Sequence, residues 1–125
     1  MTSVAILRQG DVLIASFRGD LTDRQLLELR DELADRVGTD RIRGVVLDVG
    51  ALDVIDSFVA RSLRSIVQSV RLRGTETVIT GIRPDVAIAM VQFRLNLDSL
   101  RAVLDLDEAV ALLDRIIHGE DPDDG

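Results

Sequence analysis

The sequence predicts an α/β fold in which helices pack on a mixed, mostly parallel sheet, with elements in the order β-β-α-β-α-β-α-β-α. Three observations predict it. Two short apolar runs near the N-terminus flank a turn, as in a β-hairpin. Short β-branched runs then alternate with stretches whose apolar residues recur at helical spacing. The chain of 125 residues also suits a single domain, which commonly holds about 100–150 residues.

The N-terminal third predicts a hairpin followed by a helix. Residues 4–7 and 12–17 are the two apolar runs, and residues 8–11 form a turn that contains Gly10. Thr22 and Gln25 then have the T-x-x-Q spacing of a capping box, which marks the start of a helix. The apolar stripe of this helix is Leu26, Leu29, Leu33 and Val37. Gly38 follows the stripe, where we expect the helix to stop.

The central part predicts a buried strand, a helix and a second strand. Residues 44–49 form a run rich in β-branched residues, as expected for a strand covered on both faces. Residues 57–73 have helical periodicity and end before Gly74, a stop signal. The apolar stripe of that helix is Val59, Leu63, Ile66 and Val70. Residues 75–80 are the next predicted strand.

The C-terminal part predicts two more helices around a short strand. Pro84 is expected to open a helix that runs to about Leu95, because proline is favoured at the first helical position. Residues 102–104 form a short edge strand, and Asp105 with Glu108 makes a second capping box. We expect residues 1–118 to form the domain. Residues 119–125 are acidic and lack apolar side chains, so we expect a disordered tail.

Charge and composition restrict the partners and the chemistry. The net charge of −7 argues against binding the phosphate backbone of nucleic acid. No apolar run approaches the roughly 18–20 residues that cross a bilayer. The first residues also lack the features of a signal peptide, so we expect a cytoplasmic protein without a membrane partner. The sequence has neither cysteine nor lysine, which leaves few groups for catalysis and none for disulfides.

The segment from Asp48 to Ser57 carries the densest set of polar side chains at a predicted strand end, where ligands collect in α/β sheets. One interpretation makes Asp48 the phosphoacceptor of a receiver-like domain, with Thr80 as its partner. That chemistry needs an early acidic pair and a lysine, and the sequence offers neither. A magnesium site from Asp53 and Asp56 lacks enough converging oxygens, so we expect no metal and no cofactor.

Ser57 directly precedes the apolar stripe of the second predicted helix and has two interpretations. Its hydroxyl can cap the helix by accepting a backbone N–H. Alternatively, a phosphate on Ser57 would face the unpaired N–H groups of the first turn and the positive end of the helix dipole, which suits a switch. A nucleophilic serine would need an adjacent base, and the single histidine, His118, lies far along the chain. Phe58 in the same turn is a candidate exposed docking residue.

Three segments together resemble a STAS domain, and more narrowly the small scaffold proteins of the bacterial stressosome. They are VVLDV at residues 45–49, VIDSFVA at residues 54–60 and VITGIRP at residues 78–84. The resemblance extends from about Ala5 to about Leu113. Phe58 and Val59 follow the serine where the related direct antagonists of anti-sigma factors usually have a small residue, which favours the stressosome type. Residues 93–97 lack the glycine often found at the end of the third helix, where Asn96 can serve as the cap.

The resemblance implies a non-catalytic phosphoprotein. In this family the serine of the D-S step is phosphorylated by a GHKL-type switch serine kinase that the scaffold itself sequesters, and here that serine is Ser57. Paralogous STAS sensor subunits, a PP2C-type phosphatase, a homodimer and a large hetero-oligomer are the expected partners and assemblies. Residues assigned to partner binding are Asp56, Phe58, Arg61 and Arg83. The alternative function is that of a direct anti-sigma factor antagonist, which binds an anti-sigma kinase. A remote alternative is a receiver-like phosphorelay domain that uses Asp48.

Overall fold

The computed structural model describes residues 4–19, 21–52, 57–82, 101–103 and 106–118. The elements are β1 (Val4–Gln9), β2 (Val12–Gly19), α1 (Asp23–Thr39), β3 (Gly44–Leu52), α2 (Ser57–Arg71), β4 (Glu76–Thr80), β5 (Arg101–Val103) and α4 (Leu106–Ile117). The predicted helix over residues 84–95, the proposed cap Asn96 and the tail over residues 119–125 lie outside the described residues.

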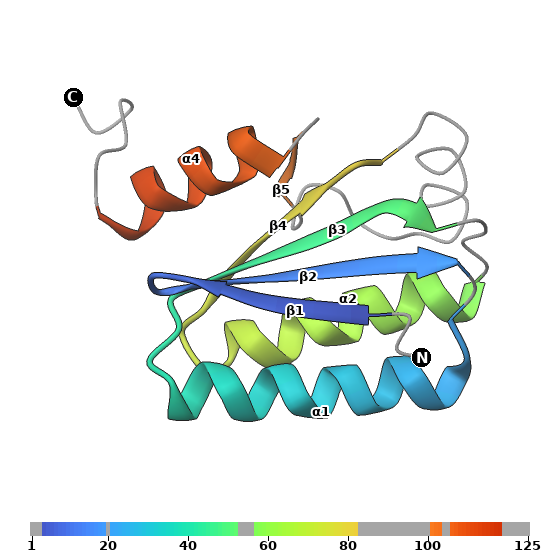
Figure 1. The fold of residues 1–125 in the computed structure, drawn as a ribbon. Helices are drawn as coiled ribbons and strands as arrows, with labels where there is room; N and C mark the ends of the chain where they lie inside the picture. The colour runs from blue at the N-terminus through green and yellow to red at the C-terminus, as the bar shows by residue number, and fades with distance from the viewer. Residues whose placement is uncertain (1–3, 20, 53–56, 83–100, 104–105, 119–125) are drawn as a thin grey trace.

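The sheet has five strands in the order β1-β2-β3-β4-β5. β1 and β2 pair antiparallel, and the other neighbouring strands pair parallel. The prediction of a mixed, mostly parallel sheet is therefore confirmed, and the strand expected at residues 102–104 is β5 at the edge of the sheet beyond β4 (Figure 1).

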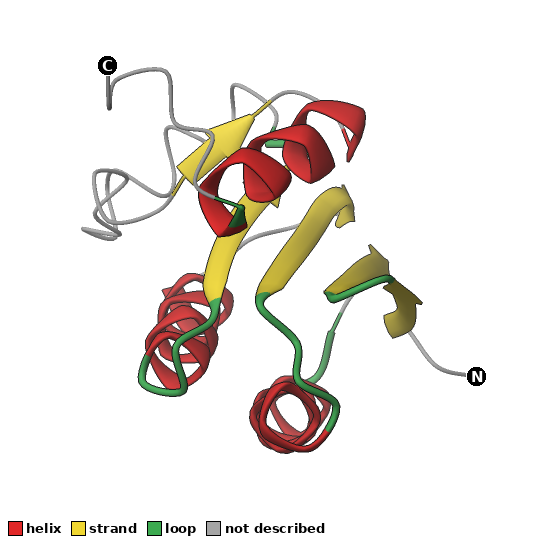
Figure 2. Ribbon diagram, turned by 90° about the vertical axis from the view of Figure 1, so that its left-hand side faces the viewer, coloured by secondary structure: helices red, strands yellow, loops and turns green. Residues whose placement is uncertain are grey.

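Helices cover both faces of this sheet. α1 and α2 lie side by side on one face, and α4 lies on the other (Figure 2). Successive residues of β3 point to opposite faces, so Val45 and Leu47 join the core under α1 and α2, whereas Val46 joins the core under α4. All three side chains are fully buried, which confirms that this strand is covered on both sides.

The β1–β2 hairpin closes through the two residues Gly10 and Asp11, in register with Val4 opposite Phe17. Gly10 has a φ of 63°, which a residue with a side chain adopts only at a cost. The carbonyl of Asp11 accepts hydrogen bonds from the N–H groups of Arg43 (2.8 Å) and Gly44 (3.3 Å). The turn is thereby tied to the start of β3.

The predicted capping box at the start of α1 is confirmed. Thr22 Oγ1 accepts a hydrogen bond from the backbone N–H of Gln25 (3.1 Å), and Gln25 Oε1 accepts one from the backbone N–H of Thr22 (2.9 Å). Two N–H groups that helix geometry leaves unpaired are satisfied reciprocally. The apolar stripe of α1 is buried against the sheet, as expected.

Replacing Thr22 with alanine is expected to lower the free energy of unfolding by about 1 kcal/mol, because the Gln25 N–H loses its partner. Urea denaturation followed by circular dichroism measures this loss. Thr22→Ser keeps the hydroxyl and should be close to wild type. Equal losses for the two variants would show that the methyl group, not the capping hydrogen bond, carries the effect.

The end of α1 differs from the prediction. The helix continues through Gly38 to Thr39, and an added Cβ at Gly38 would meet only Arg73 Nη1, at 3.8 Å. The residue with left-handed backbone is instead Arg41, at φ 57°. The N–H of Ile42 donates to the carbonyl of Val37 (3.3 Å), five residues earlier. This is the bond of a Schellman motif that spans six residues. Gly38 is therefore not the stop: the helix continues to Thr39, and the left-handed residue of the closing turn is Arg41, three positions after Gly38.

Arg41→Gly is expected to stabilise the domain by up to about 1 kcal/mol, because glycine adopts positive φ without the Cβ clash of an L-residue. Arg41 is exposed, so little packing is lost. Thermal unfolding monitored by calorimetry provides the measurement. Arg41→Ala, which removes the same side chain but keeps Cβ, is the matched control and should gain nothing.

The predicted stop after α2 is confirmed at Gly74, although the helix itself ends at Arg71 and not at Arg73. Gly74 has a φ of 80°, its N–H donates to the carbonyl of Arg71 (2.9 Å), and the N–H of Thr75 donates to the carbonyl of Val70 (3.1 Å). These are the two bonds of a Schellman motif with glycine at the left-handed position. The stripe of α2, predicted from its helical spacing, is buried: Val59, Leu63, Ile66 and Val70.

Candidate functional site

The carboxyl ends of β3 and β4 lie next to each other on the side of the sheet where α2 begins (Figure 1). Asp48 and Thr80 are register partners across these strands, as the sequence suggested. However, β3 continues to Leu52, so Asp48 lies inside the strand and not in the loop after it. Its Oδ1 accepts a hydrogen bond from the N–H of Gly50 (3.0 Å), which gives the carboxylate a local structural partner.

Gly50 and Gly81 make a close backbone contact just beyond this pair. An ideal Cβ on Gly81 would lie 2.7 Å from the Gly50 nitrogen, 2.8 Å from the Gly50 Cα and 3.0 Å from Asp48 Oδ1. Gly81 also has a φ of 84°. Both the space and the backbone conformation therefore require glycine in the T-G-I step that follows β4.

The receiver-like interpretation gains nothing from this arrangement. Thr80 is 1% exposed. Among the side chains that the structure describes, two buried hydroxyls have no hydrogen-bond partner, those of Thr80 and Thr77. Within the described ranges, no group of three or more acidic or histidine side chains could hold a metal ion. Asp53 and Asp56, the other acidic candidates, lie outside those ranges.

Ser57 is the first residue of α2, in agreement with its predicted place at a helix start. Asp56, which directly precedes it in the sequence, lies outside the described residues, as does the side chain of Ser57. The first turn of α2 carries no acidic residue. The positive end of the helix dipole therefore favours an anion at this end of the helix.

Two of the residues assigned to partner binding, Phe58 and Arg61, line a groove between α1 and α2. The groove has a volume of about 170 Å³, and its walls are Leu26, Leu27, Arg30, Phe58, Arg61, Ser62 and Ser65. Phe58 is half-buried and packs against the main core, so its expected exposure is only partial. Arg61 is exposed. The other two assigned residues, Asp56 and Arg83, lie outside the described residues.

Sequence reasoning missed Leu27 and Arg30, which α1 contributes to this groove. Leu27 is 44% exposed, although it is a large apolar side chain. A signal for it was present: it stands next to Leu26 but off the buried stripe of α1, so it cannot point into the same core. Arg30 carries no such signal, because its place in the groove depends on how α1 packs against α2.

His118 is exposed and lies 3.4 Å from Asp114, through Nε2 and Oδ1. It follows α4, whose last carbonyl, that of Ile117, accepts a hydrogen bond from Arg43 (3.4 Å) at the start of β3. α4 thus ends on the side of the molecule where β3 begins, opposite the start of α2 (Figure 1). The histidine is therefore not placed to act as a base on Ser57.

A mixed, mostly parallel sheet with helices packed on it is the fold that the sequence predicted, and the resemblance assigned this fold to the STAS domains. The family model for the STAS domain matches residues 3–109. The chain therefore belongs to the STAS domain family.

Within the family, the chain is similar to stressosome proteins. A serine-to-glutamate variant of Moorella thermoacetica RsbS has a TM-score of 0.83 and 30% identity, over 92% of this chain and 97% of that chain. A chain from a solved structure of the stressosome has a TM-score of 0.76 and 28% identity, over 90% of this chain and 98% of that one. The stressosome is described there as a signal integration and transduction hub. These likenesses confirm the predicted stressosome type.

The Bacillus subtilis RsbT co-antagonist protein RsbRD is 24% identical over 93 residues, which cover 74% of this chain and 34% of RsbRD. The chain thus spans about a third of the length of the curated relatives it matches first. In the helices that the structure describes, none is long and apolar enough to cross a membrane.

Proposed function

We propose that this chain is a non-catalytic STAS scaffold, which holds a switch serine kinase in a stressosome-like assembly and releases it when Ser57 is phosphorylated. The observation that carries the proposal is that α2 begins at Ser57 and that the next residue, Phe58, lines a groove together with Arg61. A charge added at Ser57 would therefore change the electrostatics of an apolar docking surface.

The helix start supports a switch that leaves the fold intact. A phosphate carries a charge of about −1.5 to −2, and the N-terminus of a helix stabilises such a charge. The first turn of α2 itself carries no acidic residue, although Asp56 directly precedes it in the sequence. We therefore expect phosphorylation to cost the fold little stability. A partner docked on Phe58, in contrast, must desolvate the new charge or is repelled by it.

The likeness to stressosome proteins supports the assembly part of the proposal. The scaffold is proposed to associate with paralogous STAS sensor subunits in a large hetero-oligomer in the cytoplasm, and with itself as a homodimer. A PP2C-type phosphatase removes the phosphate and resets the scaffold. Asp56 and Arg83 are proposed to contribute to partner binding together with Phe58 and Arg61.

Phosphorylation by the switch kinase tests the proposal. The chain is incubated with the kinase and ATP, and the modified residue is located by mass spectrometry. We expect phosphate on Ser57, no phosphate on Ser57→Ala, and unchanged modification of Ser69→Ala, a serine on the same helix that does not line the groove. The free energy of unfolding of Ser57→Ala should lie within about 1–2 kcal/mol of the wild-type value, because the loss is no larger than that of a helix cap. Phosphate found only elsewhere would contradict the assignment.

The native mass separates this function from that of a direct anti-sigma factor antagonist. Mixed with paralogous STAS subunits, a scaffold gives a large complex, whereas a direct antagonist gives a small complex with one anti-sigma kinase. Light scattering coupled to size-exclusion chromatography measures this mass. A small complex alone would contradict the scaffold assignment.

A further inference from the structure

The groove between α1 and α2 combines an apolar floor with positive charge. Leu26 is buried at its base, Phe58 is half-buried, and Leu27 is 44% exposed at its margin. An exposed leucine beside a half-buried phenylalanine offers apolar surface that a partner can cover. The floor is therefore suited to an apolar side chain of a partner.

The two charged residues of the groove are both arginines, one from each helix. Arg30 lies on α1 and Arg61 on α2. This is notable in a chain with a net charge of −7. A partner that enters the groove therefore meets positive charge on both sides, which selects for carboxylates.

Arg30 already contacts a carboxylate, that of Asp31, with its Nε and Nη2 each 3.3 Å from Asp31 Oδ1. The Asp31 side chain is 71% exposed. Ion pairs of this kind contribute little, since the carboxylate remains well hydrated. Arg30 can therefore exchange Asp31 for the carboxylate of a partner at small cost.

We infer that this groove binds an acidic segment of the partner protein, with an apolar side chain on Leu27 and Phe58 and carboxylates on Arg30 and Arg61. The inference rests on the proposed function and extends it from the first turn of α2 to α1. It gives the partner a chemistry: an apolar residue flanked by aspartates or glutamates.

The same groove supplies a route by which Ser57 regulates binding. Arg61 is four positions after Ser57, so both lie on one face of α2, at the spacing that favours an ion pair with the acidic member first. A phosphate on Ser57 pairs with Arg61 and removes it from the partner's carboxylate. Phosphorylation therefore acts by competition inside the groove, in addition to repulsion.

A nuclear magnetic resonance titration tests this with the full chain and a synthetic probe. The probe is an acetylated and amidated peptide with a leucine–phenylalanine pair between two pairs of aspartates. We expect the amide shifts to concentrate on Leu27, Arg30, Phe58, Arg61 and Ser62. A peptide with asparagine in place of aspartate, and one with alanine in place of the apolar pair, should each bind more weakly.

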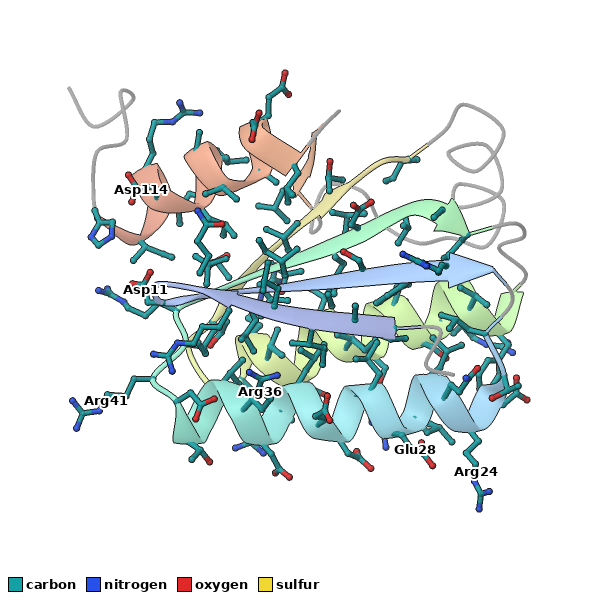
Figure 3. The ribbon with its side chains drawn as sticks, in the orientation of Figure 1. Asp11, Arg24, Glu28, Arg36, Arg41 and Asp114 are labelled. Atoms are coloured by element: carbon teal, nitrogen blue, oxygen red, sulfur yellow. The ribbon has the colours of Figure 1, made fainter. Side chains whose placement is uncertain are left out.

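Matched arginine variants locate the binding charge. Arg30→Gln and Arg61→Gln should each weaken the peptide about fivefold, the upper range for an exposed ion pair. Arg24→Gln and Arg64→Gln should leave binding unchanged, because neither residue lines the groove. Arg24 instead points away from the sheet beside Glu28, with Nε 3.7 Å from Glu28 Oε1 (Figure 3).

Phosphoserine incorporated at position 57 during expression should weaken the peptide at least as much as Arg61→Gln does, and its effect should be clearly smaller in the Arg61→Gln background, where only repulsion is left. Shifts outside the groove, or equal effects of Arg61→Gln and Arg64→Gln, would overturn the site. Additive effects of phosphoserine and Arg61→Gln would overturn the competition. These outcomes do not depend on the kinase. If the kinase failed to transfer phosphate to Ser57, only the proposed function would be contradicted.

Discussion

Gly81→Ala is expected to lower the free energy of unfolding by about 3 kcal/mol or more, the combined cost of a strained backbone and a steric overlap. The added Cβ would lie 2.7 Å from the Gly50 nitrogen and 2.8 Å from the Gly50 Cα. Both are backbone atoms within β3, so neither can move aside as a flexible side chain can. The φ of 84° adds the cost of a left-handed alanine.

Gly74→Ala is the matched control for this prediction. Gly74 has nearly the same backbone conformation, with a φ of 80°, but an added Cβ would meet nothing within 4 Å. It should therefore lose only the backbone term, about 1 kcal/mol. Chemical denaturation of both variants gives the difference, which isolates the contact between Gly81 and Gly50. Equal losses would mean that the ends of β3 and β4 can separate freely.

Ser57→Asp is expected to weaken binding of the switch kinase by about tenfold or more, equivalent to about 1.4 kcal/mol, because it places a negative charge at the docking surface. Ser57→Asn is the matched control, since it has the same size and no charge. It should bind close to wild type. Surface plasmon resonance with the immobilised kinase measures both affinities.

Loss of folding cannot explain such a result for Ser57→Asp. An acidic side chain in the first turn of a helix is stabilising, by about 0.3–1 kcal/mol, and α2 begins at this residue. We therefore expect the aspartate variant to be at least as stable as the asparagine variant. Equal kinase affinities of the two variants would contradict an electrostatic switch at this position.

The parts of the fold that depend on local chemistry were predictable from sequence. The capping box of Thr22 and Gln25 uses side chains three positions apart, so spacing alone reveals it. The left-handed Gly74 after α2 is a similar local signal. The end of α1 was not predictable in this way. There, Arg41 accepts a left-handed conformation because Ile42 closes onto Val37 and is buried.

The candidate site divides in the same manner. A helix start at Ser57 followed from the stripe beginning at Val59, which is local information. The contact between Gly50 and Gly81 joins residues far apart in sequence, and only the parallel pairing of β3 with β4 brings them together. The groove likewise needs α1 and α2 to pack side by side, so the contribution of Arg30 could not be seen in the sequence.

The affinity of the switch kinase for the chain before and after phosphorylation at Ser57 tests the central claim most directly. Isothermal titration calorimetry with each form gives both dissociation constants under the same conditions. The scaffold account predicts that the modified chain binds about tenfold more weakly or not detectably. An unchanged dissociation constant after complete modification of Ser57 would contradict it.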